Sequence, residues 1–205
     1  MSQLLAFDAN ILLWIQDNLR NPVLTAILKP LTHLGDKGII WILITLALLI
    51  FKKTRRAGIC SMFALIIMVL LNDVLLKHLI NRTRPYEVIE GLTSLVGLQS
   101  DSSFPSGHTS SSFACWIALT LSLPMVTDRS RTRIYSILML IFSVVMGFSR
   151  MYVGVHYPTD ILGGMVLGIL YGLAGYYLGK FVIRKIEEKK PGLMGEEQGQ
   201  RLAKK

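Results

Sequence analysis

The chain has 205 residues, of which 52% are hydrophobic and 17% charged, and its formal net charge is +9. A soluble domain carries roughly 25% charged residues, so this composition argues against a soluble enzyme, a disordered chain, a coiled coil and a collagen-like fibre. Lys and Arg occur in short clusters between apolar runs, as membrane-flanking charge does, and nucleic acid is not expected as a partner. The two cysteines, Cys60 and Cys115, lie inside apolar runs and predict neither a disulfide framework nor a zinc site.

Residues 1–37 predict two short amphipathic helices instead of a clear membrane span. Asp8 and Asp17 interrupt the first apolar segment, which has no basic region of the signal-peptide kind. Asn21 and Pro22 end it, and a second amphipathic piece follows. Two interpretations stay open: helices that lie in, or re-enter from, the outer membrane interface, or a helix pair packed on the bundle as ordinary core.

Five uncharged apolar stretches follow, at 38–51, 57–72, 109–127, 134–149 and 161–179. A span needs about 20 apolar residues; two stretches have that length, and amphipathic flanks or snorkelling side chains complete the others. The second stretch continues with helical spacing to residue 81, and we expect its C-terminal third to face a protein interior. The predicted fold is an all-α, polytopic membrane helix bundle with five transmembrane helices in a domain at 38–183, plus N-terminal interfacial or re-entrant helices.

The basic clusters predict the orientation. They lie at 52–56, 129–133 and 180–190, which five spans would bring to one side of the membrane. By the positive-inside rule that side is the cytoplasm, so the loops at 82–105 and 150–159 face the extracytoplasmic side. The polar segment 184–205 is expected to be a disordered cytoplasmic tail.

A stripe of glycines marks the last predicted span. Gly164, Gly168 and Gly172 recur every four residues, followed by Gly175 and Gly179. Such a stripe lets helices approach closely in lipid. Packing within the bundle is favoured over a dimer face, and the oligomeric state stays open.

Ionisable residues at membrane depth are costly and therefore indicate function. Outside the basic clusters they gather at 77–85, 103–108 and 149–160, all at the outer ends of predicted spans. Segments that end at one depth can share a site. Lys77, Arg84 and Arg150 are three cations without a matching carboxylate cluster, and guanidinium groups suit phosphate. The Pro-Ser-Gly turn at 105–107 would add backbone N–H groups at a helix start.

Two histidines in an anion site suggest a nucleophile and an acid. His156 precedes Asp160 by four residues, so a helix starting near Pro158 would bring the carboxylate within reach of the imidazole. The carboxylate would hold one ring nitrogen protonated and leave the other as nucleophile. His108 would then be free to protonate the leaving oxygen.

Other polar residues are given structural roles. Arg82 is expected to be a snorkelling anchor, and His33 and His78 to be structural or interfacial. Asn72 and Asp73 are expected to form interhelical hydrogen bonds.

The pattern resembles that of the type 2 phosphatidic acid phosphatase superfamily, whose members carry K-x6-RP, PSGH and SR-x5-H-x3-D. The resemblance implies metal-independent hydrolysis of a lipid phosphomonoester or pyrophosphate through a phosphohistidine, with no cofactor. It implies that His156 attacks phosphorus, Asp160 orients it, and His108 is the acid and later activates water. The residues implied to hold the phosphoryl oxygens are Lys77, Arg84, Ser106, Gly107 and Arg150.

Two competing functions are considered. A lipid phosphotransferase of the same fold would pass the phosphoryl group to a second lipid instead of water. A transporter or binding protein for phosphorylated lipids would need the cations but not the histidine pair. The motifs do not name the lipid: phosphatidylglycerophosphate, phosphatidic acid and undecaprenyl pyrophosphate all present a terminal phosphate at the interface.

Overall fold

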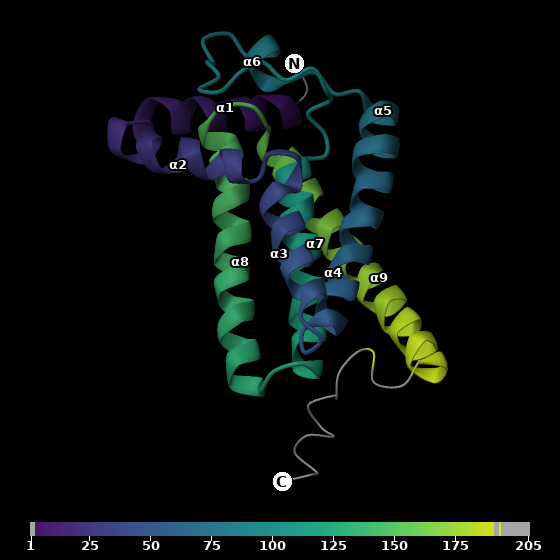
Figure 1. Cartoon of the computed structure of the whole chain (residues 1–205). Helices are drawn as coiled ribbons and strands as arrows, with labels where there is room; N and C mark the ends of the chain where they lie inside the picture. Colours follow the sequence, from purple (N-terminus) through teal and green to yellow (C-terminus); the bar gives the residue numbers. More distant parts are fainter. Residues whose placement is uncertain (1–2, 191–192, 194–205) are drawn as a thin grey trace.

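The computed structural model describes residues 3–190 and 193, and every regular element in that part of the chain is helical. Figure 1 shows long helices side by side, with two helices lying across one end of the bundle. In chain order the elements are α1 (Gln3–Leu19), α2 (Pro22–Leu34), η1 (Asp36–Gly38), α3 (Ile39–Ile50), α4 (Arg55–Met68), the π-helical η2 (Val69–Leu76), α5 (Lys77–Ile80), α6 (Pro85–Val88), α7 (Gly107–Ser122), η3 (Leu123–Met125), α8 (Arg129–Tyr152) and α9 (Pro158–Lys189).

Helix α7 lies at the centre of the bundle and packs against α4, α8 and α9. Small side chains such as Ala64 of α4 and Ala114 of α7 are fully buried there, and Trp41 and Tyr171 fill the wider spaces around them. Large apolar side chains on the outer helices, such as Leu138 of α8, are exposed, as expected for surfaces that face lipid.

The prediction of five transmembrane helices is not confirmed. Within the described residues, three helices are long and apolar enough to cross a membrane: Arg55–Val88, Arg129–Tyr152 and Pro158–Lys189. A fourth span results if α2 and the segment Asp36–Ile50, which meet at a 50° bend, count as one. Helix α7 has only 16 residues and α3 only 12, shorter than a bilayer core normally requires.

The glycine stripe of α9 packs inside the bundle, as the sequence favoured. A Cβ atom added at Gly168 would lie 2.6 Å from the carbonyl oxygen of Ser110, and one added at Gly172 would lie 2.6 Å from that of Ala114. The absence of side chains therefore lets α9 approach the backbone of α7.

The predicted continuous helix forms as α4, η2 and α5, but its C-terminal third is buried on one side only. Asn72 is fully buried and accepts a hydrogen bond from the Ser110 hydroxyl at 2.8 Å. Leu71 and Val74 are 41% and 58% exposed. The expectation that this third faces a protein interior is therefore wrong for its apolar side.

Helices α1 and α2 lie across the end of the bundle (Figure 1). Leu12, Ile15 and Leu28 are buried beneath them, whereas Trp14 and Val23 are exposed on the outside. Both helices therefore pack on the bundle and also present an apolar outer surface. That this surface lies in the membrane interface stays a prediction.

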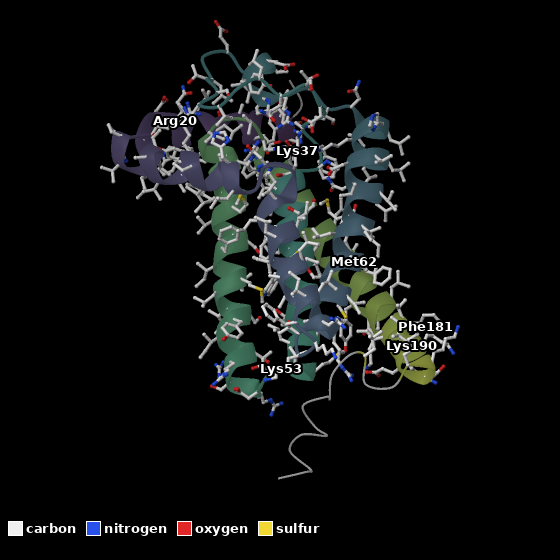
Figure 2. All side chains as sticks on the ribbon, in the orientation of Figure 1. Arg20, Lys37, Lys53, Met62, Phe181 and Lys190 are labelled. Carbon is white, nitrogen blue, oxygen red and sulfur yellow. The ribbon has the colours of Figure 1, made fainter. Side chains whose placement is uncertain are left out.

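The labelled lysines of the predicted basic clusters lie toward one end of the bundle. Lys53 and Lys190 lie toward the end opposite α1 and α2, whereas Lys37 lies close to them (Figure 2). Helix α9 continues to Lys189, so the first residues of the predicted tail at 184–205 are helical. Of the rest of that tail, 191–192 and 194–205 lie outside the described residues.

Candidate active site

A cavity of about 830 Å³ lies near the end of the bundle that α1 and α2 cover. Six of the eight residues predicted to form the site line it: Lys77, Arg84, Gly107, His108, Arg150 and His156. Ser106 and Asp160 are fully buried behind this lining. The segments at 77–85, 103–108 and 149–160 therefore converge, as their common depth predicted.

His156 connects the cations in front of it with a carboxylate behind. The ring is 2% exposed, and its Nε2 lies 3.1 Å from Nη1 of Arg84. Its Nδ1 lies 3.4 Å from Oδ2 of Asp160, but the two atoms do not align as a hydrogen bond, and they form an ion pair only when the ring is protonated. The capping position of Asp160 explains the arrangement, because its Oδ2 also accepts the backbone N–H of Tyr157 at 2.9 Å.

Burial lowers the pKa of His156 well below its ordinary value of 6.5, and the nearby cations Arg84 and Arg150 lower it further. The imidazole is therefore neutral around pH 7. A neutral ring is the state required of a nucleophile.

Two of the cations share a carboxylate that the motifs did not indicate. Asp101 lies 2.6 Å from Nζ of Lys77 and 2.6 Å from Nη2 of Arg84. Burial raises the pKa of Asp101, but the ion pairs with Lys77 and Arg84 outweigh burial and lower it to about 2. The loop at 82–105, which contains Asp101, was predicted only to face the extracytoplasmic side. Nothing in its sequence separates Asp101 from Glu87 or Glu90.

Arg150 receives its support from the N-terminal segment. Its Nη1 donates to the hydroxyl of Thr32 in α2 at 2.7 Å, and both side chains are buried. Its Nε, also buried, has no hydrogen-bond partner among the described residues. Residues 1–37 therefore form part of the site, a role that the sequence did not reveal.

His108 also contacts this segment. Its Nε2 lies 3.1 Å from Oδ1 of Asp36, and Oδ2 of the same carboxylate lies 2.8 Å from Nδ1 of His33. His33 was expected to be structural or interfacial only, but it contacts the Asp36 carboxylate and lines the cavity with it. Asp36 follows the end of α2 without any recognisable motif, so no sequence pattern indicated its contact with His108.

The turn at 105–107 supplies a close backbone approach. A Cβ atom at Gly107 would lie 3.3 Å from Oδ1 of Asp73 and 3.5 Å from Nζ of Lys77. Ser106 caps α7, but its hydroxyl accepts from Thr109 at 3.0 Å inside the protein. Gly107 lines the cavity, whereas the Ser106 side chain is directed toward the packing of α7.

Arg82 is not a snorkelling anchor, and that expectation is wrong. Its Nη1 lies 2.6 Å from Oδ1 of Asp160, and its Nη2 lies 2.9 Å from Oδ2 of Asp8 in α1. The guanidinium also lies over the Tyr157 ring, 3.9 Å from its centre. Both carboxylates are fully buried, so Arg82 is the cation that balances them. Arg82 is 74 residues from Asp8 and 78 residues from Asp160, so no local sequence pattern could predict these ion pairs.

The fold and the site thus define a membrane helix bundle with a cation-lined cavity and two histidines, suited to phosphate esters. The sequence model of the PAP2 superfamily matches residues 57–184, well over half of the chain. The chain therefore belongs to the PAP2 superfamily, as the three motifs predicted.

Curated relatives are similar over much of the chain. An undecaprenyl-diphosphatase from Sulfolobus acidocaldarius is 34% identical over 129 residues, 63% of this chain and 58% of that protein. Two Bacillus subtilis proteins, the undecaprenyl-diphosphatase BcrC and phosphatidylglycerophosphatase B, are 32% and 34% identical over 158 residues, each alignment covering 74% of this chain and 73% of the relative. The chain thus spans more than half, but not all, of each relative's length. The expected enzyme class, a lipid phosphate phosphatase, agrees with these names.

A solved structure agrees with the fold. The crystal structure of a transmembrane PAP2-type phosphatidylglycerolphosphate phosphatase from Bacillus subtilis superposes with a TM-score of 0.72 and 28% identity, covering 91% of this chain and 89% of the other. The all-helical, membrane-embedded character predicted from composition is confirmed by this similarity.

Proposed function

We propose that this protein hydrolyses the terminal phosphate of a membrane lipid, a phosphomonoester or pyrophosphate, through a phosphohistidine on His156. The observation that carries the proposal is the position of His156 Nε2. It lines the cavity 3.1 Å from Arg84, with the Asp160 carboxylate 3.4 Å from the other ring nitrogen. A neutral nucleophile held between a cation and a carboxylate suits attack on a phosphoryl group.

The reaction would take two steps. In the first, Nε2 of His156 forms a bond to phosphorus, the ester or anhydride P–O bond breaks, and His108 gives a proton to the leaving oxygen. In the second, His108 takes a proton from water, the oxygen of that water attacks phosphorus, and the P–N bond breaks. Asp160 would stabilise the charge that His156 acquires in the first step.

Lys77, Arg84 and Arg150 would match the charge on the phosphoryl oxygens, with backbone N–H groups at the start of α7 near Gly107. Ser106 would support the site from behind its lining, since its backbone N–H donates to the Asp160 carbonyl oxygen at 3.3 Å and its hydroxyl accepts from Thr109. Among residues 3–190 and 193, no group of three or more His, Cys, Asp or Glu side chains is arranged so that it could hold a metal ion. We therefore propose that the cations replace the metal ions that other phosphatases use.

An apolar groove supports a lipid as substrate. A second cavity of about 360 Å³ lies between α3 and the helix formed by α4 and η2, lined by side chains such as Ile42, Leu46 and Met62. It shares Lys37, Gly38, Met68 and Val69 with the lining of the larger cavity. A lipid whose phosphate is held at His156 could thus place its hydrocarbon chain along α3, where apolar side chains replace water around it.

A phosphate-release panel tests this function. Purified protein in detergent is given phosphatidylglycerophosphate, phosphatidic acid or undecaprenyl pyrophosphate singly, with His156→Gln as the blank. We expect free phosphate from at least one lipid and none from the variant. Release of no phosphate until a second lipid is added would indicate a phosphotransferase, and binding without turnover in both proteins would indicate a carrier.

We also propose that the site faces the extracytoplasmic side of the cell membrane, because the basic clusters lie toward the opposite end of the bundle. Leu98, in the loop at 86–104, is 81% exposed, and both native cysteines are buried. A Leu98→Cys protein should react with an impermeant thiol reagent in intact cells, whereas Lys53→Cys should react only after the membrane is opened. The reverse pattern would overturn the orientation.

A further inference from the structure

We propose that Asp36 is a positioning residue for His108: its carboxylate holds Nε2–H of the imidazole, so that protons pass to and from the reacting oxygens through Nδ1. The inference rests on the proposed function, in which His108 is the acid. The sequence motifs and the resemblance assign no role to Asp36, which lies in the turn between α2 and α3.

The backbone of this turn supports the contact. Lys37 and Gly38 have φ values of 53° and 70°, so the chain makes a tight left-handed turn directly after Asp36. A Cβ atom at Gly35 would lie 2.5 Å from Cδ2 of His108. The missing side chain thus lets the turn lie against the imidazole edge that carries Nε2, and Oδ1 of Asp36 reaches that nitrogen at 3.1 Å.

The arrangement suits both proton transfers. In this proposal a protonated His108, which also has a backbone contact with Thr32, donates Nε2–H to Asp36 and would donate Nδ1–H to the leaving oxygen. After that proton is transferred, Nε2 keeps its hydrogen on Asp36, and Nδ1 has a lone pair for the attacking water. A carboxylate in this position fixes the tautomer and stabilises the imidazolium, as the orienting group of a triad does.

Other charged groups face His108 as well. Arg150 of α8 and His156 lie across the cavity, and Lys77 and Asp73 lie beside the adjacent Gly107. On η1 and α2, Asp36 also contacts His33. Asp36 is thus the carboxylate that contacts His108 directly and opposes the cations around it.

The test compares two synthetic phosphomonoesters with the same apolar chain, one releasing an alkanol and the other a nitrophenol. An alkanol needs a proton as it leaves, whereas a nitrophenolate does not. The measured parameter is kcat/KM, which reports the steps up to the first irreversible one and so excludes hydrolysis of the phosphoenzyme.

The variants are Asp36→Asn and Asp36→Glu. The control is Asp128→Asn, because the Asp128 and Asp36 side chains are both 46% exposed and Asp128 lies at the start of α8, outside the cavity lining.

We expect Asp36→Asn to lower kcat/KM about 10- to 100-fold for the alkyl ester but less than about threefold for the nitrophenyl ester, because only the first needs general acid catalysis. Asp36→Glu should recover part of the loss, and Asp128→Asn should match the wild type. In Asp36→Asn the alkaline limb of the pH profile for the alkyl ester should move to lower pH, because an imidazolium without its carboxylate loses its proton more easily.

The ratio between the two esters is taken within one preparation, so loss of folded protein cancels. Equal losses for both esters, or no loss, would refute the role of Asp36. Failure of the wild-type protein to form a phosphohistidine at His156 would instead refute the proposed function, whatever the ratio.

Discussion

Replacing Arg82 with Ala should destabilise the protein and lower its turnover together. Arg82 contacts two fully buried carboxylates, Asp8 at 2.9 Å and Asp160 at 2.6 Å. Removing one partner of a buried ion pair costs about 3–5 kcal/mol, because an uncompensated charge stays behind. The Arg82 side chain is 24% exposed, so we take the lower figure, about 3 kcal/mol. For a chain of this size that corresponds to a Tm decrease of roughly 6–12 °C.

Thermal unfolding in detergent measures the first effect, and phosphate release per folded molecule measures the second. The second variant, Arg82→Ala with Asp8→Asn, removes one of the two stranded charges and should recover part of the Tm. Its turnover should stay low, because Asp160 still lacks the Arg82 ion pair, one of the contacts that hold its carboxylate, and keeps the backbone N–H of Tyr157. An Arg82→Ala protein that melts within about 2 °C of the wild type and keeps its turnover would refute this reasoning.

Three further expectations concern the cavity. Because the pKa of His156 lies well below 6.5, the nucleophile stays neutral on mild acidification. The midpoint of the acid limb of kcat/KM should therefore lie at a pH below 6.5, and a midpoint above that pH would contradict the burial argument. Arg84→Ala should lower kcat/KM about 10²–10³-fold, since it removes a preorganised donor, and a loss under threefold would exclude Arg84 from the phosphate site. Activity should persist in EDTA, and its recovery only on adding magnesium would contradict a metal-independent mechanism.

The helical fold and most of the site could be predicted because each depended on a local pattern. Long apolar runs indicated the bundle, and the spacing of His156 and Asp160 brought them together on the first turn of α9. The glycines of α9 indicated close packing, which the approach of Gly168 to α7 bears out. In each case the informative residues lie within one helix or at its end.

The remaining parts depend on contacts between distant segments. Asp8, Thr32 and Asp36 come from α1, α2 and η1 and contact Arg82, Arg150 and His108 respectively, the nearest of these pairs 72 residues apart. No local spacing marks such pairs.

The prediction of five spans is not confirmed for a different reason. The apolar runs at 38–51 and 109–127 suggested spans, but α3 ends at Ile50 after 12 residues and α7 ends at Ser122 after 16 residues. Both helices are shorter than a bilayer core normally requires.

The central claim is a covalent intermediate on His156, and trapping it tests that claim most directly. Protein is mixed briefly with a 32P-labelled lipid phosphate and quenched in alkali, and the label is located by peptide mapping. Phosphohistidine survives base, so we expect label on the peptide that contains His156, absent from His156→Gln and retained in His108→Ala when the leaving group is a nitrophenol. Turnover of the wild-type protein without base-stable label at His156 would contradict the account.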